Sequence, residues 1–275
     1  MQTTGALALV AALAASGAAI AGDKPTIVLV HGAFSESSSW NGVIAELGRD
    51  GYHAIAAANP LRGVASDAAS VASVVRAIPG EVVLVGHSYG GPVITEAANG
   101  QDNIKALVYV AGFAPDTGES SLTLSAQFPG STLGEALTPV ALPDGGTDLY
   151  IRPEKFHAQF AADVPAGTAS LMAATQRPVT EAALTEPSGI PAWKSIPSYV
   201  IYGSEDRNIP AAVMAFMAER MQARKAVVID GASHALMVSH AGEVAALIEE
   251  AASDVTHTAT TAAEMKLHRI AGRSK

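Results

Sequence analysis

The sequence contains no cysteine and little charge, and both absences limit what the protein can do. Without thiols the chain forms no disulfide, has no cysteine nucleophile and builds no zinc–thiolate or iron–sulfur site. Charged residues make up only 16% of the 275 residues, which is typical of a compact domain. The 17 basic and 26 acidic residues give a formal charge of −9, the sign opposite to that of a general nucleic-acid binder. We therefore expect a compact domain, or two, that does not bind nucleic acid.

The amino-terminal segment also lacks charge, since no charged side chain precedes Asp23. Ala6 to Ala15 is a nearly unbroken run of Ala, Leu and Val, and Ala19-Ile20-Ala21 fits the small-x-small pattern of signal peptidase. The run is too short to span a bilayer comfortably, and it lacks the basic residues that normally begin a secretory signal. We predict a cleaved signal peptide over residues 1–21 and a periplasmic or secreted protein without stable membrane insertion. The alternatives are an Ala-rich tail and a buried helix.

The carboxyl-terminal segment is basic, whereas the rest of the chain is acidic. Residues 253–275 are rich in Thr and Ala and hold four of the 17 basic residues but two of the 26 acidic ones. Such a basic end on an acidic protein is more often a solvated terminus than an interaction arm. We predict a flexible basic tail over 253–275 and assign it no function.

Short apolar runs alternate with amphipathic stretches between these two ends. Runs of β-branched and other apolar residues, too short for helices, predict strands buried on both faces at 26–30, 82–85, 106–110, 199–202 and 226–229, with a weaker one at 53–57. Helical spacing lies between them, as for Trp40, Val43, Ile44 and Leu47. This alternation predicts an α/β domain with a mostly parallel sheet of about six strands, flanked by helices and formed by residues 22–114 and 194–252.

One long stretch breaks the alternation. Residues 115–193 show no strong strand but contain Pro and Gly breaks and patches compatible with helix. Structureless loops of this length are rare inside compact domains, so we predict a mostly helical lid inserted before the strand at 199–202. Loops that leave the carboxyl ends of parallel strands border the ligand crevice, and such a lid would shape a substrate pocket.

Residues with catalytic chemistry follow three of the predicted strands. The run at 82–85 leads into Gly-His-Ser-Tyr-Gly-Gly at 86–91, a G-x-S-x-G pattern between a strand and a helix-compatible stretch. Glu205 and Asp206 follow the strand at 199–202, and Asp230 and His234 follow the strand at 226–229. A serine nucleophile needs a base and a carboxylate that orients the base, and Ser88, His234 and one of these carboxylates would share one edge of the sheet. The alternative is an ordinary Gly-rich turn with an idle serine.

Four sequence motifs together resemble the α/β-hydrolase superfamily. They are Val30 to Phe34, Gly86 to Gly91, Glu205 to Pro210 and Gly231 to Met237. The chain is most similar to the branch that contains plant methylesterases and hydroxynitrile lyases, with their bacterial esterase relatives, from about Pro25 to Ala251. This resemblance implies an α/β-hydrolase fold.

The resemblance also implies a role for each matching residue. It makes Ser88 the nucleophile, His234 the general base and Asp206 the residue that orients the imidazole. The backbone N–H groups of Ala33 and Tyr89 would form the oxyanion hole. We expect the substrate pocket to be lined by Phe34, Leu236 and Met237, although the last two fit core positions equally well.

Other carboxylates could orient His234, and other histidines lie near the predicted site. Glu205 and Asp116 are the alternatives to Asp206 as the acid. His31 and His87 adjoin the functional backbone, where we expect them to brace loops rather than transfer protons. The sequence has no metal-binding H-E-x-x-H pattern and no phosphate-binding glycine loop after a strand, so we expect neither a metal nor a cofactor.

Two positions differ from those of relatives with other activities, and these differences disfavour some of the reactions known for the superfamily. Hydroxynitrile lyases of this branch carry Lys directly after the catalytic His, whereas this chain has Ala235. Serine at position 88 disfavours the relatives that use an Asp nucleophile. We predict a carboxylesterase that cleaves a small, largely apolar ester through an acyl-enzyme. The alternatives are a lactonase, a C–C hydrolase or an acyltransferase with the same three residues, or a non-catalytic ligand-binding module.

Overall fold

The protein is built around one six-stranded parallel sheet. The computed structural model describes residues 24–143 and 145–271, with side chains as far as Thr256, so the predicted signal peptide at 1–21 lies outside the described residues. The sheet order is β2-β1-β3-β4-β8-β9, and every neighbouring pair is parallel. The strands are β1 (Thr26–Val30), β2 (Ala54–Ala57), β3 (Val82–His87), β4 (Ile104–Val110), β8 (Ser198–Gly203) and β9 (Lys225–Ile229). All six predicted strands occur, and the predicted α/β-hydrolase sheet is confirmed. The prediction that the strand at 226–229 is buried on both faces was wrong, because β9 is an edge strand and Val228 is 52% exposed.

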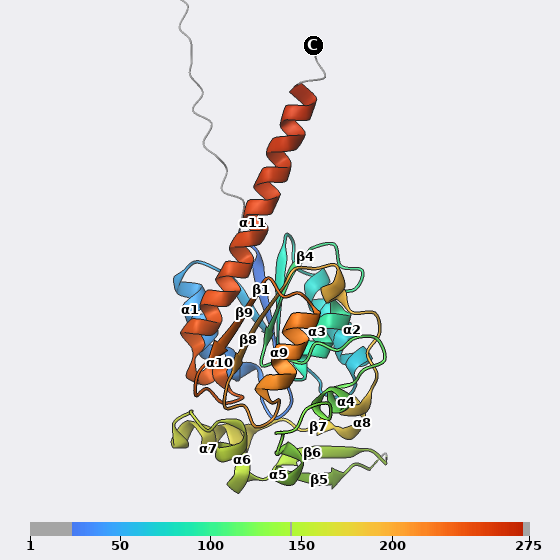
Figure 1. Ribbon diagram of the computed structural model, residues 1–275, viewed down its shortest axis with the longest axis vertical. Helices are drawn as coiled ribbons and strands as arrows, with labels where there is room; N and C mark the ends of the chain where they lie inside the picture. Colours follow the sequence, from blue (N-terminus) through green and yellow to red (C-terminus); the bar gives the residue numbers. More distant parts are fainter. Residues whose placement is uncertain (1–23, 144, 272–275) are drawn as a thin grey trace, which may run out of the picture.

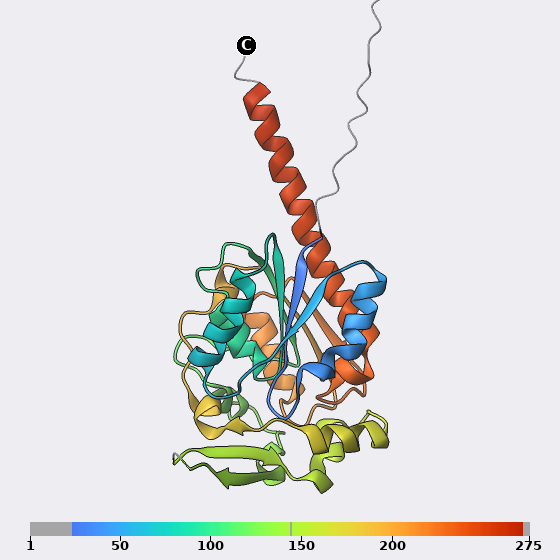
Figure 2. The same ribbon diagram turned by 180° about the vertical axis from the view of Figure 1, so that it is seen from behind.

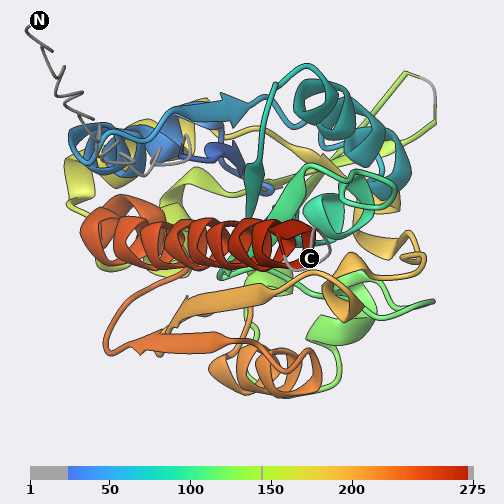
Figure 3. The ribbon, with the colours of Figure 1, turned by 90° about the horizontal axis from the view of Figure 1, so that it is seen from above.

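Helices cover both faces of this sheet (Figure 3). One face carries α1 (Asn41–Arg49) and α11 (Ala241–Ala271), and the other carries α2 (Val64–Arg76), α3 (Gly90–Ala97) and α9 (Ala211–Arg220). The central strands β1, β3 and β4 are almost wholly buried, because apolar side chains on both of their faces meet helices.

The segment between β4 and β8 lies across the carboxyl ends of the strands (Figures 1 and 2). This inserted segment, residues 115–193, contains α4 (Ser121–Ser125), α5 (Leu133–Ala136), α6 (Pro153–Phe160), α7 (Ala166–Thr175) and α8 (Glu181–Thr185), and η2 (Ala192–Lys194) begins at its end. It also holds an antiparallel sheet of β5 (Leu137–Ala141), β6 (Thr147–Ile151) and β7 (Val179–Thr180). The regular structure of the segment is mostly helical, as predicted, but no pattern in the sequence indicated these three strands. β5 is largely exposed and contains Pro139, and β7 has two residues, so neither has the apolar run that marks a buried strand.

Charged side chains connect the inserted segment to the start of α2. Arg62 Nη1 lies 2.7 Å from Asp148 Oδ1 on β6. Glu186 accepts hydrogen bonds from the backbone N–H groups of Val64 (2.6 Å) and Ala65 (3.2 Å). A carboxylate there satisfies N–H groups that have no partner within the helix and complements the helix dipole.

The carboxyl-terminal prediction is also corrected. Residues 253–271 continue α11 rather than forming a flexible tail, and residues 272–275 lie outside the described residues. Buried Ala251, Ala252 and Val255 attach this helix to the domain, and the Ala-rich sequence beyond them favours helix. Its far end projects from the edge of the sheet opposite the inserted segment (Figure 1). No helix in the described part of the chain is long and apolar enough to cross a membrane.

Candidate active site

The turn from β3 into α3 holds Ser88 in a strained backbone conformation. Ser88 has φ of +54°, which is uncommon for a residue with a side chain. The turn is this tight because its flanking residues are glycines. A Cβ at Gly86 would lie 2.6 Å from the Gly90 carbonyl oxygen, and one at Gly90 would lie 2.6 Å from the Val30 carbonyl oxygen. The G-x-S-x-G spacing thus reflects close backbone contacts that lift Ser88 to the edge of the sheet.

The structure brings Ser88, His234 and Asp206 together. His234 Nε2 lies 2.8 Å from Ser88 Oγ, and His234 Nδ1 lies 2.6 Å from Asp206 Oδ2. The other carboxylate oxygen, Asp206 Oδ1, accepts the backbone N–H groups of Asn208 (2.8 Å) and Ile209 (2.9 Å). Since the carboxylate can only accept, Nδ1 donates to it and Nε2 is left to accept the Ser88 proton. This is the arrangement that nucleophilic catalysis by serine requires.

The rival acids lie elsewhere. Asp116 pairs with Lys194 at 2.5 Å, and hydrogen bonding to this ammonium lowers the pKa of Asp116. Glu205 is exposed. Of the three candidate acids, Asp206 is the one whose carboxylate contacts His234.

Two further histidines hold the loops around this site. His31 donates from Nδ1 to the Gly32 carbonyl oxygen (3.0 Å) and accepts the Asn59 backbone N–H at Nε2 (3.1 Å). His87 Nε2 donates to the His234 carbonyl oxygen (3.1 Å). Burial lowers the pKa of His31 to about 4 and that of His87 well below the usual histidine range. Both rings are therefore neutral near pH 7 and serve to connect loops.

The loop after β1 reaches the serine turn only because residue 32 is glycine. A Cβ there would lie 2.6 Å from Ser88 Cβ and 3.1 Å from the Tyr89 backbone nitrogen. Ala33 and Tyr89 both border the same cavity as Ser88. Neither of their N–H groups donates a hydrogen bond to another described residue. Two unpaired N–H groups beside a serine hydroxyl can stabilise an oxyanion.

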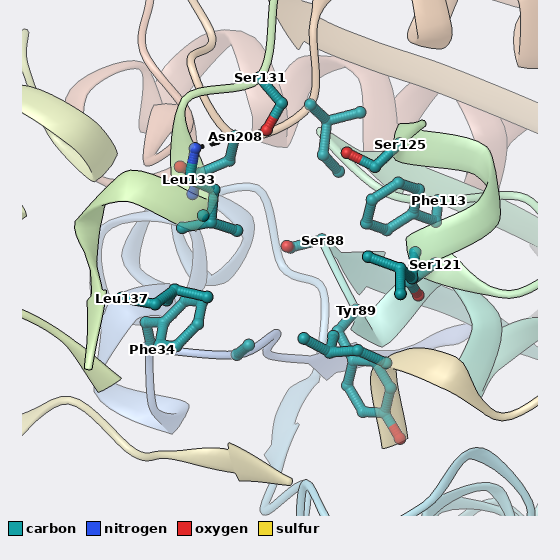
Figure 4. Close-up of a pocket in the computed structure, with 15 residues that line it drawn as sticks. Phe34, Ser88, Tyr89, Phe113, Ser121, Ser125, Ser131, Leu133, Leu137 and Asn208 are labelled. Atoms are coloured by element: carbon teal, nitrogen blue, oxygen red, sulfur yellow. Dashed lines mark hydrogen bonds between the residues drawn. The ribbon is translucent and has the colours of Figure 1, made fainter. Parts of the chain in front are cut away.

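A cavity of about 160 Å³ opens over Ser88 (Figure 4). The domain contributes Ala33, Phe34, Ser88, Tyr89, Phe113, Asn208 and Ile209, and the inserted segment contributes Ser121, Leu122, Ser125, Ser131, Leu133, Gly134, Leu137 and Leu184. Phe34 thus lies where the sequence predicted. Leu236 and Met237 do not line this cavity, and that prediction was wrong. Both are fully buried in α10 (Leu236–Ser239), which turns them into the core beside α1 and α11.

Most of the cavity wall was missed by the sequence reasoning. Leu133, Leu137 and Leu184 are far from Ser88 in the chain, and no motif marks them. Asn208 and Ile209 had a usable signal, since they follow Asp206 directly and their N–H groups must face its carboxylate.

A second contact connects the inserted segment to the loop that carries His234. Asp163 accepts hydrogen bonds from the hydroxyls of Ser233 and Ser239, the latter at 2.7 Å. The Phe160 carbonyl oxygen accepts the Ala235 N–H at 3.0 Å, and the Phe160 ring packs edge-on against His234 at 5.0 Å between centroids. The position of His234 therefore depends on both regions of the chain. In the described part of the chain, no group of three or more His, Asp or Glu residues could hold a metal ion.

The fold and this site define an α/β hydrolase with a serine at the turn after the third strand. The model of the alpha/beta hydrolase family matches residues 27–247, so the chain belongs to that family, as its motifs predicted. An alpha/beta hydrolase of Aspergillus novofumigatus (strain IBT 16806), nvfD, is 26% identical over 254 residues, with 84% of this chain and 98% of that protein covered.

Solved structures share the fold. Polyneuridine aldehyde esterase has a TM-score of 0.73 at 20% identity, with 82% of this chain and 98% of that chain covered. The methylesterase protein MES16 from Arabidopsis has a TM-score of 0.67 at 20% identity, with 83% and 99% covered. These two structures are an esterase and a methylesterase, the kind of relative that the motifs indicated.

Proposed function

We propose that the protein is a serine carboxylesterase that cleaves a small, largely apolar ester through an acyl-enzyme. The observation that carries this proposal is the continuous hydrogen-bonded chain from Asp206 through His234 to Ser88, at 2.6 and 2.8 Å. It ends at a cavity with mostly apolar walls. The esterase names of the two structural neighbours agree with it.

The geometry supports a two-step reaction. His234 Nε2 takes the proton as Ser88 Oγ attacks the ester carbonyl, and the carbonyl oxygen becomes an oxyanion held by the N–H groups of Ala33 and Tyr89. When the C–O bond breaks, the same imidazole gives its proton to the departing alcohol. Water then attacks the acyl group with His234 again as base, and Ser88 is released with the carboxylic acid. Asp206 keeps Nδ1 protonated throughout and stabilises the imidazolium without taking its proton.

Residue 235 supports hydrolysis over cyanide release. A lyase would need a cation beside His234 to stabilise the departing cyanide, and Ala235 is a buried apolar residue. The hydroxyl at position 88 likewise supports an acyl-enzyme route over the chemistry of an Asp nucleophile.

Labelling and turnover together test the proposal. We expect a fluorophosphonate probe to label the protein once, at Ser88, and p-nitrophenyl esters with short acyl chains to be hydrolysed. The Ser88→Ala variant should lose both properties, whereas Ser125→Ala, which removes another hydroxyl from the same cavity, should still be labelled. Unchanged turnover in Ser88→Ala, or labelling of another residue, would contradict the mechanism. Labelling of Ser88 without turnover of esters, lactones or thioesters would instead indicate a ligand-binding module.

A further inference from the structure

Asn208 and Ser121 are among the polar side chains that are nearly buried in the wall of the cavity over Ser88. Asn208 is 3% exposed and lines the cavity. Its backbone N–H donates to Asp206, and residues of the inserted segment line the same cavity. Figure 4 places Asn208 on the same border of the cavity as Leu133 and Ser131, with Ser88 at the centre. A polar group in such an apolar place needs a hydrogen-bond partner, or its burial costs free energy.

The orientation of the Asn208 amide is determined by its neighbours. The Gln159 side-chain nitrogen lies 3.0 Å from the Arg207 carbonyl oxygen, and since a carbonyl only accepts, this atom must be the donor Nε2. The same Nε2 lies 2.9 Å from the Asn208 side chain, so it faces the acceptor Oδ1. Thr132 donates to Gln159 Oε1 at 2.9 Å, which fixes the other end of that amide. The group that Asn208 leaves unused is therefore its N–H donor, Nδ2.

Among the hydrogen bonds of the described residues, none has Asn208 Nδ2 as the donor. Ser125 and Ser131 also direct hydroxyls toward the cavity (Figure 4), but both side chains are partly exposed and water can reach them. Asn208 is only 3% exposed, and a ligand that fills the cavity would displace the little water that reaches its Nδ2. A ligand that brings an acceptor to Nδ2 thus gains a hydrogen bond, and a purely hydrocarbon ligand leaves the donor unpaired.

We propose that Asn208 is a specificity-determining residue that selects esters with a second oxygen acceptor. The preferred substrate carries an ether or carbonyl oxygen in its acyl or alcohol part, a few bonds from the scissile ester. That oxygen accepts a hydrogen bond from Asn208 Nδ2 while Ser88 attacks the ester carbonyl. The inference rests on the proposed esterase function and adds a substrate class to it.

Matched esters test the preference. In the acyl series, the p-nitrophenyl esters of methoxyacetic, 3-methoxypropanoic and 4-methoxybutanoic acids are compared with p-nitrophenyl butanoate, pentanoate and hexanoate, respectively, which have the same chain lengths. In the alcohol series, butyl acetate is compared with 2-methoxyethyl acetate. For the wild-type protein we expect at least one oxygen-bearing ester to exceed its hydrocarbon partner in kcat/KM by about tenfold. The ratio within a pair is measured on one preparation, so it is insensitive to the fraction of folded enzyme and to general effects on the triad.

Three variants separate the amide from the rest of the cavity wall. Asn208→Leu should bring the ratio close to one. Gln159→Leu leaves Asn208 in place but removes the donor that orients it, and should lower the ratio partway. Leu137→Ala enlarges the cavity without touching the amide, and should keep the ratio while changing the preferred chain length.

The outcomes are distinct. A wild-type ratio near one in both series, or an unchanged ratio in Asn208→Leu, overturns the selection by Asn208 while ester hydrolysis stands. Failure of wild-type protein to hydrolyse any ester or to be labelled at Ser88 overturns the esterase function, and the inference with it.

Discussion

The edge of the sheet and the inserted segment face one another across the cavity, but they are built in different ways. At the sheet edge, glycines at 32, 86 and 90 let backbone segments approach so closely that a single added carbon would clash. In the inserted segment the cavity wall includes Leu133, Leu137 and Leu184, and its strand β5 is largely exposed. Reacting groups therefore lie where the backbone has little freedom, and the groups that shape the substrate lie where side chains can be exchanged.

This difference explains how one scaffold can accept different substrates. Catalysis depends on atoms placed within a few tenths of an ångström, which a packed sheet edge provides. Selection among esters depends on the size and polarity of a wall, which can vary without moving Ser88. The contact between Asp163 and the His234 loop is the exception, because there the inserted segment reaches the reacting groups.

The strongest test of the sheet edge is Asp206→Asn. The change is nearly isosteric, so folding should persist, but an amide no longer holds Nδ1 as the donor and does not stabilise the imidazolium. We expect kcat to fall by about ten-thousandfold. Asp116→Asn and Glu205→Gln should retain near-normal turnover, since their carboxylates do not contact His234. Loss of activity in either of these and not in Asp206→Asn would assign the acid to another loop.

Gly32→Ala tests whether close backbone contact is what the sheet edge contributes. The new Cβ would meet Ser88 Cβ at 2.6 Å, so the loop that carries the Ala33 N–H must move away. We expect kcat to fall by roughly a hundredfold to a thousandfold, the usual effect of losing an oxyanion donor. Gly48→Ala on α1, where an added Cβ meets nothing within 4 Å, is the matched control and should leave steady-state kinetics intact. Equal kinetics in both variants would refute the steric argument.

Asp163→Ala and Asp148→Ala test whether the contact between the inserted segment and the His234 loop affects catalysis. Each removes one carboxylate that connects the inserted segment to the domain, but only Asp163 contacts the loop of His234. We expect Asp163→Ala to lower kcat and the rate of fluorophosphonate labelling by about tenfold with little change in KM, because the positioning of the base affects chemistry more than binding. Asp148→Ala should leave the labelling rate near that of the wild type. If the two variants behave alike, the contact serves only to anchor the segment.

The smallest expected effect concerns stability rather than rate. His31 has a folded-state pKa of about 4, below its usual 6.5, so the unfolded chain binds a proton between these pH values when the folded one does not. Stability should therefore fall as the pH drops from 6.5 to 4, by on the order of 2–3 kcal/mol from this group. Thermal unfolding across this range should show a weaker pH dependence in His31→Gln than in the wild type. The same change at the exposed His53 should not alter that dependence.

The sequence predicted the sheet and the three residues at its edge because both depend on local patterns. Buried parallel strands need continuous apolar runs, and the turn at Ser88 needs glycine at fixed spacing. The errors fall where those constraints are absent. Exposed β5 and short β7 have no apolar run, and Leu236 and Met237 follow His234 in the chain but turn into the core.

By itself, then, the sequence determined the strands of the sheet, the strained serine turn and the order of Ser88, Asp206 and His234 along the chain. Only the tertiary structure decided among Asp206, Asp116 and Glu205, because the choice depends on which carboxylate reaches Nδ1. It also decided the cavity wall and the orientation of the Asn208 amide. Both arise from contacts between residues far apart in the chain, such as Gln159 with Asn208, for which no periodicity or spacing gives a signal.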